Sequence, residues 1–143
     1  MKKIFSLILL STFLTGCTSL TYSERTAIRS LKTQGITVDK PVGMWEAPAK
    51  SGAAGLLNLL PGVGNFYLAT GAGADKSHYL YGFLNLLCWP LSIVWGVPEG
   101  FIDADSINER ELIYYYTHDE GGKEALKEKG FELTATGKLE PVK

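Results

Sequence analysis

Few side chains in this chain have the type and spacing that chemistry requires. The two histidines, His78 and His118, have no Cys or Glu at the spacing of a metal site, so each is expected to be an ordinary surface residue. The glycine-rich segment 71–77, GAGADKS, lacks the Gly-Lys pair of a phosphate-binding loop, because Asp75 precedes Lys76. The segment therefore predicts a turn and no nucleotide site.

Three acidic residues, Glu99, Asp103 and Asp105, follow the most apolar part of the chain. Paired carboxylates can bind a cation or transfer protons. Here their position favours a structural role, since negative charge stabilises the positive end of a following helix. The sequence therefore predicts a protein that is not an enzyme and needs no metal or cofactor. A hydrolase that uses His118 with acidic residues is the weaker alternative.

The first sixteen residues have the pattern of an export signal. Lys2 and Lys3 precede an apolar run, IFSLILLSTFL, that is too short to span a membrane and leads into small residues. We therefore expect residues 1–16 to be a signal peptide that the mature chain lacks.

A lipid anchor is expected directly after this signal. Leu14–Cys17 (LTGC) resembles the lipobox of bacterial lipoproteins. The resemblance implies cleavage before Cys17, attachment of diacylglycerol to its thiol, and acylation, for example by palmitate, of the new amine. Thr18 stands where an Asp retains such lipoproteins in the inner membrane. This implies the outer membrane, facing the periplasm, with the inner membrane as the alternative. Cys88 is then expected to be a small buried hydrophobe.

Charge is absent from the centre of the chain. Residues 51–74 and 77–98 contain no Asp, Glu, Lys or Arg, and most of the charge lies in 22–50 and 99–143. The formal net charge of the 143 residues is −1, so the chain lacks the basic patch of a nucleic-acid-binding protein. The length predicts one domain. The distribution of charge predicts that this domain has an apolar centre and polar flanks.

The apolar centre is expected to contact membrane lipid or a protein partner. Residues 79–98 are apolar at helical spacing and also between those positions. A helix that is apolar all round is buried in a large core or in a membrane, and this chain is too short to provide such a core. The expected contact residues are Leu56, Leu57, Leu60, Phe66, Tyr67, Leu80, Phe83, Leu84, Leu87, Trp89, Leu91 and Trp95.

This part of the chain also resembles a bacterial family of membrane hairpins. LLNLLPGVGNFYL (56–68), LYGFLNLLCW (80–89) and VPEGFIDA (97–104) are similar to the TM-two domain, in which two hydrophobic helices pair. The match departs from the family at Asn65, where His-Arg is usual. The resemblance implies a hydrophobic hairpin over residues 51–104 and association with a membrane.

The charges near the hairpin favour a shallow position in the membrane. The connector between the two apolar blocks, residues 71–78, contains one Lys, whereas the flanks contain Lys40, Lys50 and Arg110. A span that placed the connector in the cytoplasm would reverse the positive-inside bias. We therefore expect the hairpin to dip into the periplasm-facing leaflet beside the lipid anchor. The alternative is a soluble hairpin whose apolar face packs on residues 106–131.

Amphipathic helices are expected on both sides of the hairpin. Residues 22–34 predict one such helix, with Ser23 as its N-cap and a stop at Gly35. Ser106 and Glu109 have the spacing of a capping box, which predicts that a second helix starts there.

The polar flanks also predict a little β-structure. The segments ITV (36–38) and FEL (131–133) could pair into a two-stranded sheet, and the tail from residue 134 is expected to be loose. We therefore predict a mainly α fold: a hydrophobic helical hairpin, flanking amphipathic helices and a possible small two-stranded sheet (α+β). Residues 17–50 and 105–143 would flank the hairpin.

The predicted function is that of a lipid-anchored envelope protein, a non-enzymatic structural or accessory module. Its partners would be membrane lipid, through acylated Cys17 and the apolar hairpin, and an envelope protein or a second copy of the chain. The alternative is a partner-binding lipoprotein, of the inhibitor or immunity type, that docks its apolar hairpin on another envelope protein.

Overall fold

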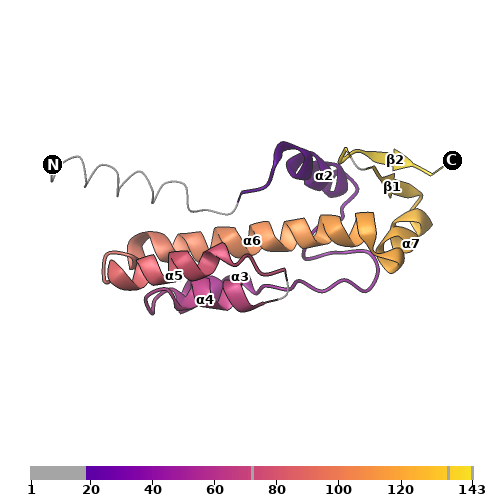
Figure 1. Ribbon diagram of the computed structural model, residues 1–143. Coiled ribbons are helices and arrows are strands. Elements are labelled where there is room, and N and C mark those ends of the chain that lie inside the picture. Colours follow the sequence, from indigo (N-terminus) through magenta and orange to yellow (C-terminus); the bar gives the residue numbers. More distant parts are fainter. Residues whose placement is uncertain (1–18, 72, 135, 143) are drawn as a thin grey trace.

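The chain folds into a mainly helical structure with one small sheet, as predicted (Figure 1). The computed structural model describes residues 19–71, 73–134 and 136–142, so the expected signal peptide and Cys17 lie outside the described residues. In chain order the elements are α2 (Tyr22–Thr33), α3 (Ser51–Leu57), α4 (Val63–Thr70), α5 (Ser77–Leu87), α6 (Ile93–His118), α7 (Glu120–Glu128), β1 (Phe131–Leu133) and β2 (Leu139–Pro141).

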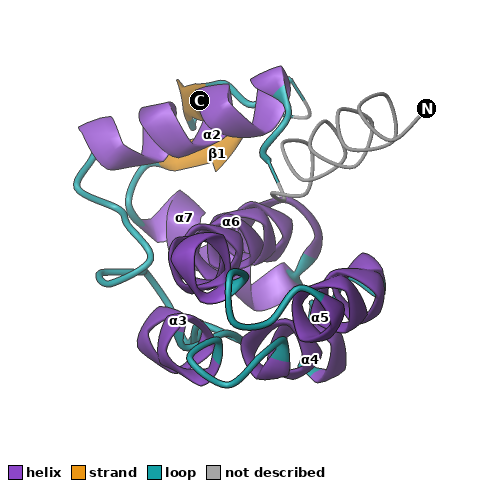
Figure 2. Ribbon diagram, turned by 90° about the vertical axis from the view of Figure 1, so that its left-hand side faces the viewer, coloured by secondary structure: helices purple, strands orange, loops and turns teal. Residues whose placement is uncertain are grey.

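The long helix α6 is the axis of the molecule. Helices α3, α4 and α5 lie along its N-terminal part, while α2, α7 and the sheet surround its C-terminal part (Figures 1 and 2). A helix start at Ser106 is therefore wrong, because α6 begins at Ile93 and continues through Pro98. Gly100, Asp103 and Ala104 are buried on one side of α6, so packing holds this stretch helical and no cap is needed before Ser106.

The C-terminal part of α6 organises an ordinary aliphatic core. Leu31 of α2, Leu112 and Tyr116 of α6 and Leu126 of α7 are almost completely buried against one another. The Tyr116 hydroxyl accepts a hydrogen bond from the Val42 N–H at 2.7 Å and donates to the Val42 carbonyl at 3.1 Å. We call this part of the molecule, the described residues of 19–50 and 105–142, the polar half. It thus keeps large apolar side chains inside.

The sheet forms between different segments from those expected. β1 pairs with β2 in antiparallel register, Phe131 opposite Pro141, so the prediction of a loose tail is wrong. The predicted pairing of 36–38 with 131–133 is also wrong, since Thr37 forms only an isolated bridge with Lys40. A local hairpin closes a short loop, and this costs less chain entropy than joining two segments that lie far apart in sequence.

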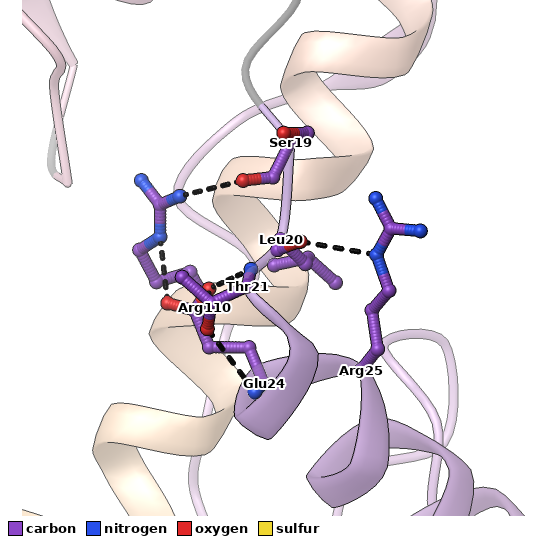
Figure 3. A network of polar contacts seen from close by, with 6 residues as sticks. All are labelled: Ser19, Leu20, Thr21, Glu24, Arg25 and Arg110. Atoms are coloured by element: carbon purple, nitrogen blue, oxygen red, sulfur yellow. Dashed lines mark hydrogen bonds and ion pairs between the residues drawn. The ribbon is translucent and has the colours of Figure 1, made fainter.

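Helix α2 is held to α6 by a network at its N-terminus (Figure 3). The N-cap is Thr21, and the prediction of Ser23 is wrong; Gly35, with φ +73°, follows the helix end as expected. The Glu24 carboxylate accepts hydrogen bonds from the Thr21 N–H at 2.6 Å and from Arg110 Nε at 3.1 Å. Burial alone would raise the pKa of Glu24, but these donors hold it below its ordinary value.

Replacing Glu24 with Gln is expected to lower the free energy of unfolding at pH 7 by about 1 kcal/mol, the usual value of a cap. Because the pKa of Glu24 is lowered in the folded chain, its stabilisation is present above the ordinary value of 4.5 and is lost as the pH falls below it. The difference between wild type and E24Q in urea unfolding should therefore shrink between pH 7 and pH 3. The control is E120Q, since the Glu120 side chain is 97 % exposed. A difference that persists unchanged at pH 3 would contradict this account.

Candidate membrane-contact site

Each apolar block folds back on itself to form a separate helical hairpin. The first is α3, a turn at 58–62, and α4; the second is α5, a turn at 88–92, and α6. Both turns lie at the same end of the molecule, on the left in Figure 1. We call residues 51–104 the hairpin half and this end the turn end. The expectation of one hairpin with the connector at its tip is therefore wrong.

The connector lies at the opposite end of the hairpin half from the two turns. Gly73 approaches the Glu111 side chain of α6 so closely that a Cβ there would meet it at 2.8 Å. The chain turns within each block because Pro61 and Pro90 interrupt the helical hydrogen bonding there, and Gly62 takes a left-handed conformation with φ +75°. The backbone of Gly62 also packs directly on the Gly82 carbonyl, which joins the first turn to α5.

The outside of the hairpin half is apolar. Large apolar side chains there have half or more of their surface exposed: Leu56, Leu59, Leu60, Leu80, Phe83, Leu86, Leu87, Trp89, Leu91, Val94 and Ile102. Of the predicted contact residues, Leu57, Phe66, Tyr67, Leu84 and Trp95 are instead half-buried, as is Cys88. An exposed apolar surface of this extent is typical of a contact with lipid or protein.

The inside of the hairpin half is rich in polar groups. The polar side chains buried between its helices are Asn58, Asn65, His78, Asn85, Ser92 and Asp103, and they share the interior with Leu68 and several alanines. The predicted surface position of His78 is therefore wrong, since it is 0 % exposed, and Asp103 lies inside α6 and caps no helix. This concentration of buried polar groups, with most of the leucines outside, contrasts with the aliphatic core of the polar half.

Amide side chains connect the hairpins through hydrogen bonds. Asn58 Nδ2 donates to the Gly96 carbonyl of α6 at 2.6 Å, and Asn58 Oδ1 accepts from the Asn65 N–H at 3.2 Å. Asn85 Nδ2 donates to Asn65 Oδ1 at 3.1 Å, and Asn85 Oδ1 accepts from Trp95 Nε1 at 2.8 Å. Asn58 thus reaches from the first hairpin to the second, and Asn85 reaches from the second to the first.

Burial shifts the pKa of two ionisable groups in the hairpin half. Burial lowers the pKa of His78, against the opposing charge of Asp75, so that the imidazole is neutral over a wider range of pH. His78 Nδ1 lies 3.8 Å from Asp103 Oδ2. Burial raises the pKa of Glu99, although a hydrogen bond with Asn85 opposes this. In both groups burial disfavours the charged form.

Small residues allow the hairpin helices to approach closely. Gly96, Gly100 and Ala104 recur every fourth residue and are buried on one face of α6. A Cβ at Gly100 would meet the Ala54 carbonyl of α3 at 2.7 Å, and one at Gly64 would meet the same carbonyl. Small residues at this spacing are typical of helix contacts inside membranes, where backbones approach without large side chains between them.

Two sequence signals could have located this interior. The tetrapeptide LNLL occurs at 57–60 and again at 84–87, which places Asn58 and Asn85 at equivalent positions of the two blocks. The small residues at 96, 100 and 104 form the second signal. Each signal marks the buried face of a helix, whereas the predicted contact residues follow from large apolar side chains alone.

The other candidate residues do not form a reactive cluster. His118 is exposed, stacks on Tyr114 with ring centroids 4.6 Å apart, and lies beside a surface hollow of about 500 Å³. Among the described residues that line this hollow, Glu24 is the one acidic residue, and its carboxylate accepts hydrogen bonds from Thr21 and Arg110. Over the described part of the chain, no three His, Cys, Asp or Glu side chains are grouped as metal ligands.

None of the described helices is both long enough and apolar enough to cross a bilayer.

Comparisons with protein-family models, with curated proteins and with solved structures gave no match to this chain.

Replacing Asn85 with Leu is expected to destabilise the hairpin half by about 2 kcal/mol, because Asn65 Oδ1 and Trp95 Nε1 lose their partner inside a low-dielectric interior. Chemical unfolding in a mild detergent, followed by tryptophan fluorescence, measures the change. The matched control is Leu86→Ala, next in sequence but half exposed, which should change stability by less than about 0.5 kcal/mol. If N85L were as stable as wild type, the amide network would not hold the hairpins together.

Proposed function

We propose that this protein is a lipid-anchored, non-enzymatic component of the bacterial envelope whose hairpin half contacts membrane lipid. One observation supports this above the others: the hairpin half has its asparagine amides inside and most of its leucines outside, while the polar half of the same chain has the ordinary arrangement. Water favours the second arrangement and hydrocarbon favours the first. One chain therefore has parts suited to two different solvents.

The size of the apolar surface supports the same conclusion. Complete burial of a Leu or Phe side chain is worth roughly 1.5–3 kcal/mol, so a half-exposed one forgoes about 1 kcal/mol in water. The exposed side chains of the hairpin half together forgo on the order of 10 kcal/mol. Lipid contact would recover much of this energy.

The lipid anchor would act together with this surface. Its acyl chains, attached at Cys17, contribute about 0.8 kcal/mol for each buried CH₂ group, and one chain alone holds a protein only weakly. A second attachment through the hairpin half would make residence in the membrane stable. From the lipobox and Thr18 we assign the protein to the periplasmic face of the outer membrane.

Flotation with liposomes tests the lipid contact without the anchor. The mature chain from residue 17, with Cys17→Ser, is expected to float with the vesicles, because the hairpin half is sufficient for binding. Adding Leu87→Asp, a change at a side chain that is 65 % exposed, should reduce the floated fraction at least tenfold, since a charge in hydrocarbon costs about 2.5 kcal/mol or more.

The matched control is Met44→Asp, in the polar half, where the side chain is 96 % exposed and flotation should not change. If the acyl-free chain stays in the buffer as a monomer, lipid contact is wrong. If it fails to float but forms a stoichiometric complex with an envelope protein, the alternative of a partner-binding lipoprotein is correct.

A further inference from the structure

We infer that the hairpin half enters a single leaflet with its turn end leading, from the same side as the anchor at Cys17. This inference rests on the proposed lipid contact and adds the direction, the depth and the position of the membrane boundary. It differs from a spanning hairpin because the described part of the connector that precedes α5, residues 71 and 73–76, stays on the side from which the protein enters.

The direction follows from the positions of apolar and charged groups. The turn end has exposed Leu59, Leu60, Trp89 and Leu91, and neither turn contains an ionisable side chain other than the thiol of Cys88. Entry of this end into hydrocarbon therefore removes apolar surface from water without burying a charge.

Charged residues lie at the opposite end of the same helices. Lys50 directly precedes α3, Lys76 directly precedes α5, and Asp105 follows the apolar part of α6; all three are exposed. Lysines at helix ends can extend to lipid headgroups, and aspartate is expensive to place in hydrocarbon. These residues therefore mark the membrane boundary.

The depth follows from the lengths of the helices. The eleven residues of α5 rise about 16 Å, and the stretch of α6 from Ile93 to Asp105 rises about 18 Å. The hydrocarbon core of a bilayer is about 30 Å thick, so one leaflet provides about 15 Å. An upright hairpin half therefore fills one leaflet, and its turn end reaches the bilayer midplane.

The anchor can reach the same leaflet. Arg110 Nη2 donates to the Ser19 carbonyl at 3.4 Å, which places the start of the described chain beside α6 (Figure 3). Arg110 lies five residues beyond Asp105, about 8 Å along the helix, which is close to the thickness of the headgroup layer. The described chain therefore begins on the charged side of the proposed membrane boundary, and the expected anchor at Cys17 precedes Ser19 by two residues in sequence.

Nitroxide labels along α5 test this orientation. Single cysteines replace Lys76, Leu80, Phe83 and Leu87 in the acylated mature protein with Cys88→Ser, since all four side chains are exposed and the Cys17 thiol is already acylated. In preformed vesicles, relative collision rates with oxygen and with a water-soluble nickel complex report the depth of each label. The expected depth increases steadily from position 76 to position 87 by about 16 Å, or 1.5 Å per residue.

External ascorbate, which does not cross the bilayer, separates entry from crossing. A label at position 76 should be reduced as fast as a control label at Met44→Cys in the polar half, and a label at position 87 should be protected. Protection of position 76 would mean that the connector crosses, and the inference would be wrong.

The remaining outcomes separate the inference from the proposed function. Equal, shallow depths at all four positions would show a hairpin half that lies flat, which overturns the inference but leaves lipid contact intact. Labels that all remain in water would overturn both.

Discussion

The hairpin half depends on hydrogen bonds between amide side chains in a place where water does not compete. In the polar half, helices associate because leucines leave water, which is the usual driving force. In the hairpin half most of the leucines point outward, and a small apolar cluster that includes Ala54 and Leu68 is buried, so that force contributes less. Close contact with the α3 backbone at Gly64 and Gly100 and the hydrogen bonds made by Asn58 and Asn85 add to it. These hydrogen bonds are strongest in a low-dielectric surrounding.

Helix α6 joins the two arrangements because it changes character along its length. Its first ten residues expose Val94, Phe101 and Ile102, whereas the stretch beyond Asp105 buries Ile107, Leu112 and Tyr116. Both packing modes use one rigid element, so the polar half keeps a fixed position relative to the hairpin half. The ion pair of Arg110 with Glu24 extends this order to α2 and hence to the start of the described chain.

The sequence predicted the composition of this molecule better than its geometry. The apolar centre, the helix-rich fold and the small sheet were all predictable, because hydrophobic runs and glycine stops act locally. The course of the chain was not, since the connector with Asp75 and Lys76 is a stronger polar signal than Pro61 or Pro90. The charged connector predicts a turn between the two apolar blocks. In the structure the chain also turns within each block, where the prolines interrupt the helices.

The interior was missed for a related reason. The surface prediction for His78 followed from its lack of ligand spacing, and residues 79–98, which include Asn85, were interpreted by their apolar side chains. Neither reasoning identifies a buried polar partner. Whether a polar residue in an apolar segment is a liability or a contact depends on the neighbouring helix, and that information is tertiary. The outward position of Leu80, Phe83 and Leu87, by contrast, follows from an apolar segment in a chain too short to cover it.

The position of the polar half relative to the membrane is the property on which its biological role would depend. Two attachments in one leaflet, an acyl group and a rigid body, restrict rotation far more than an acyl group alone, because the second contact is intramolecular and adds orientation as well as affinity. In the proposed orientation, the part of α6 beyond Asp105 would rise about 20 Å from the boundary, and α2, α7 and the sheet would be held at a set height and direction. A freely tethered lipoprotein samples all orientations. A chain attached in the proposed way would instead present the same surface, that of α2 and the sheet, to the aqueous side of the membrane.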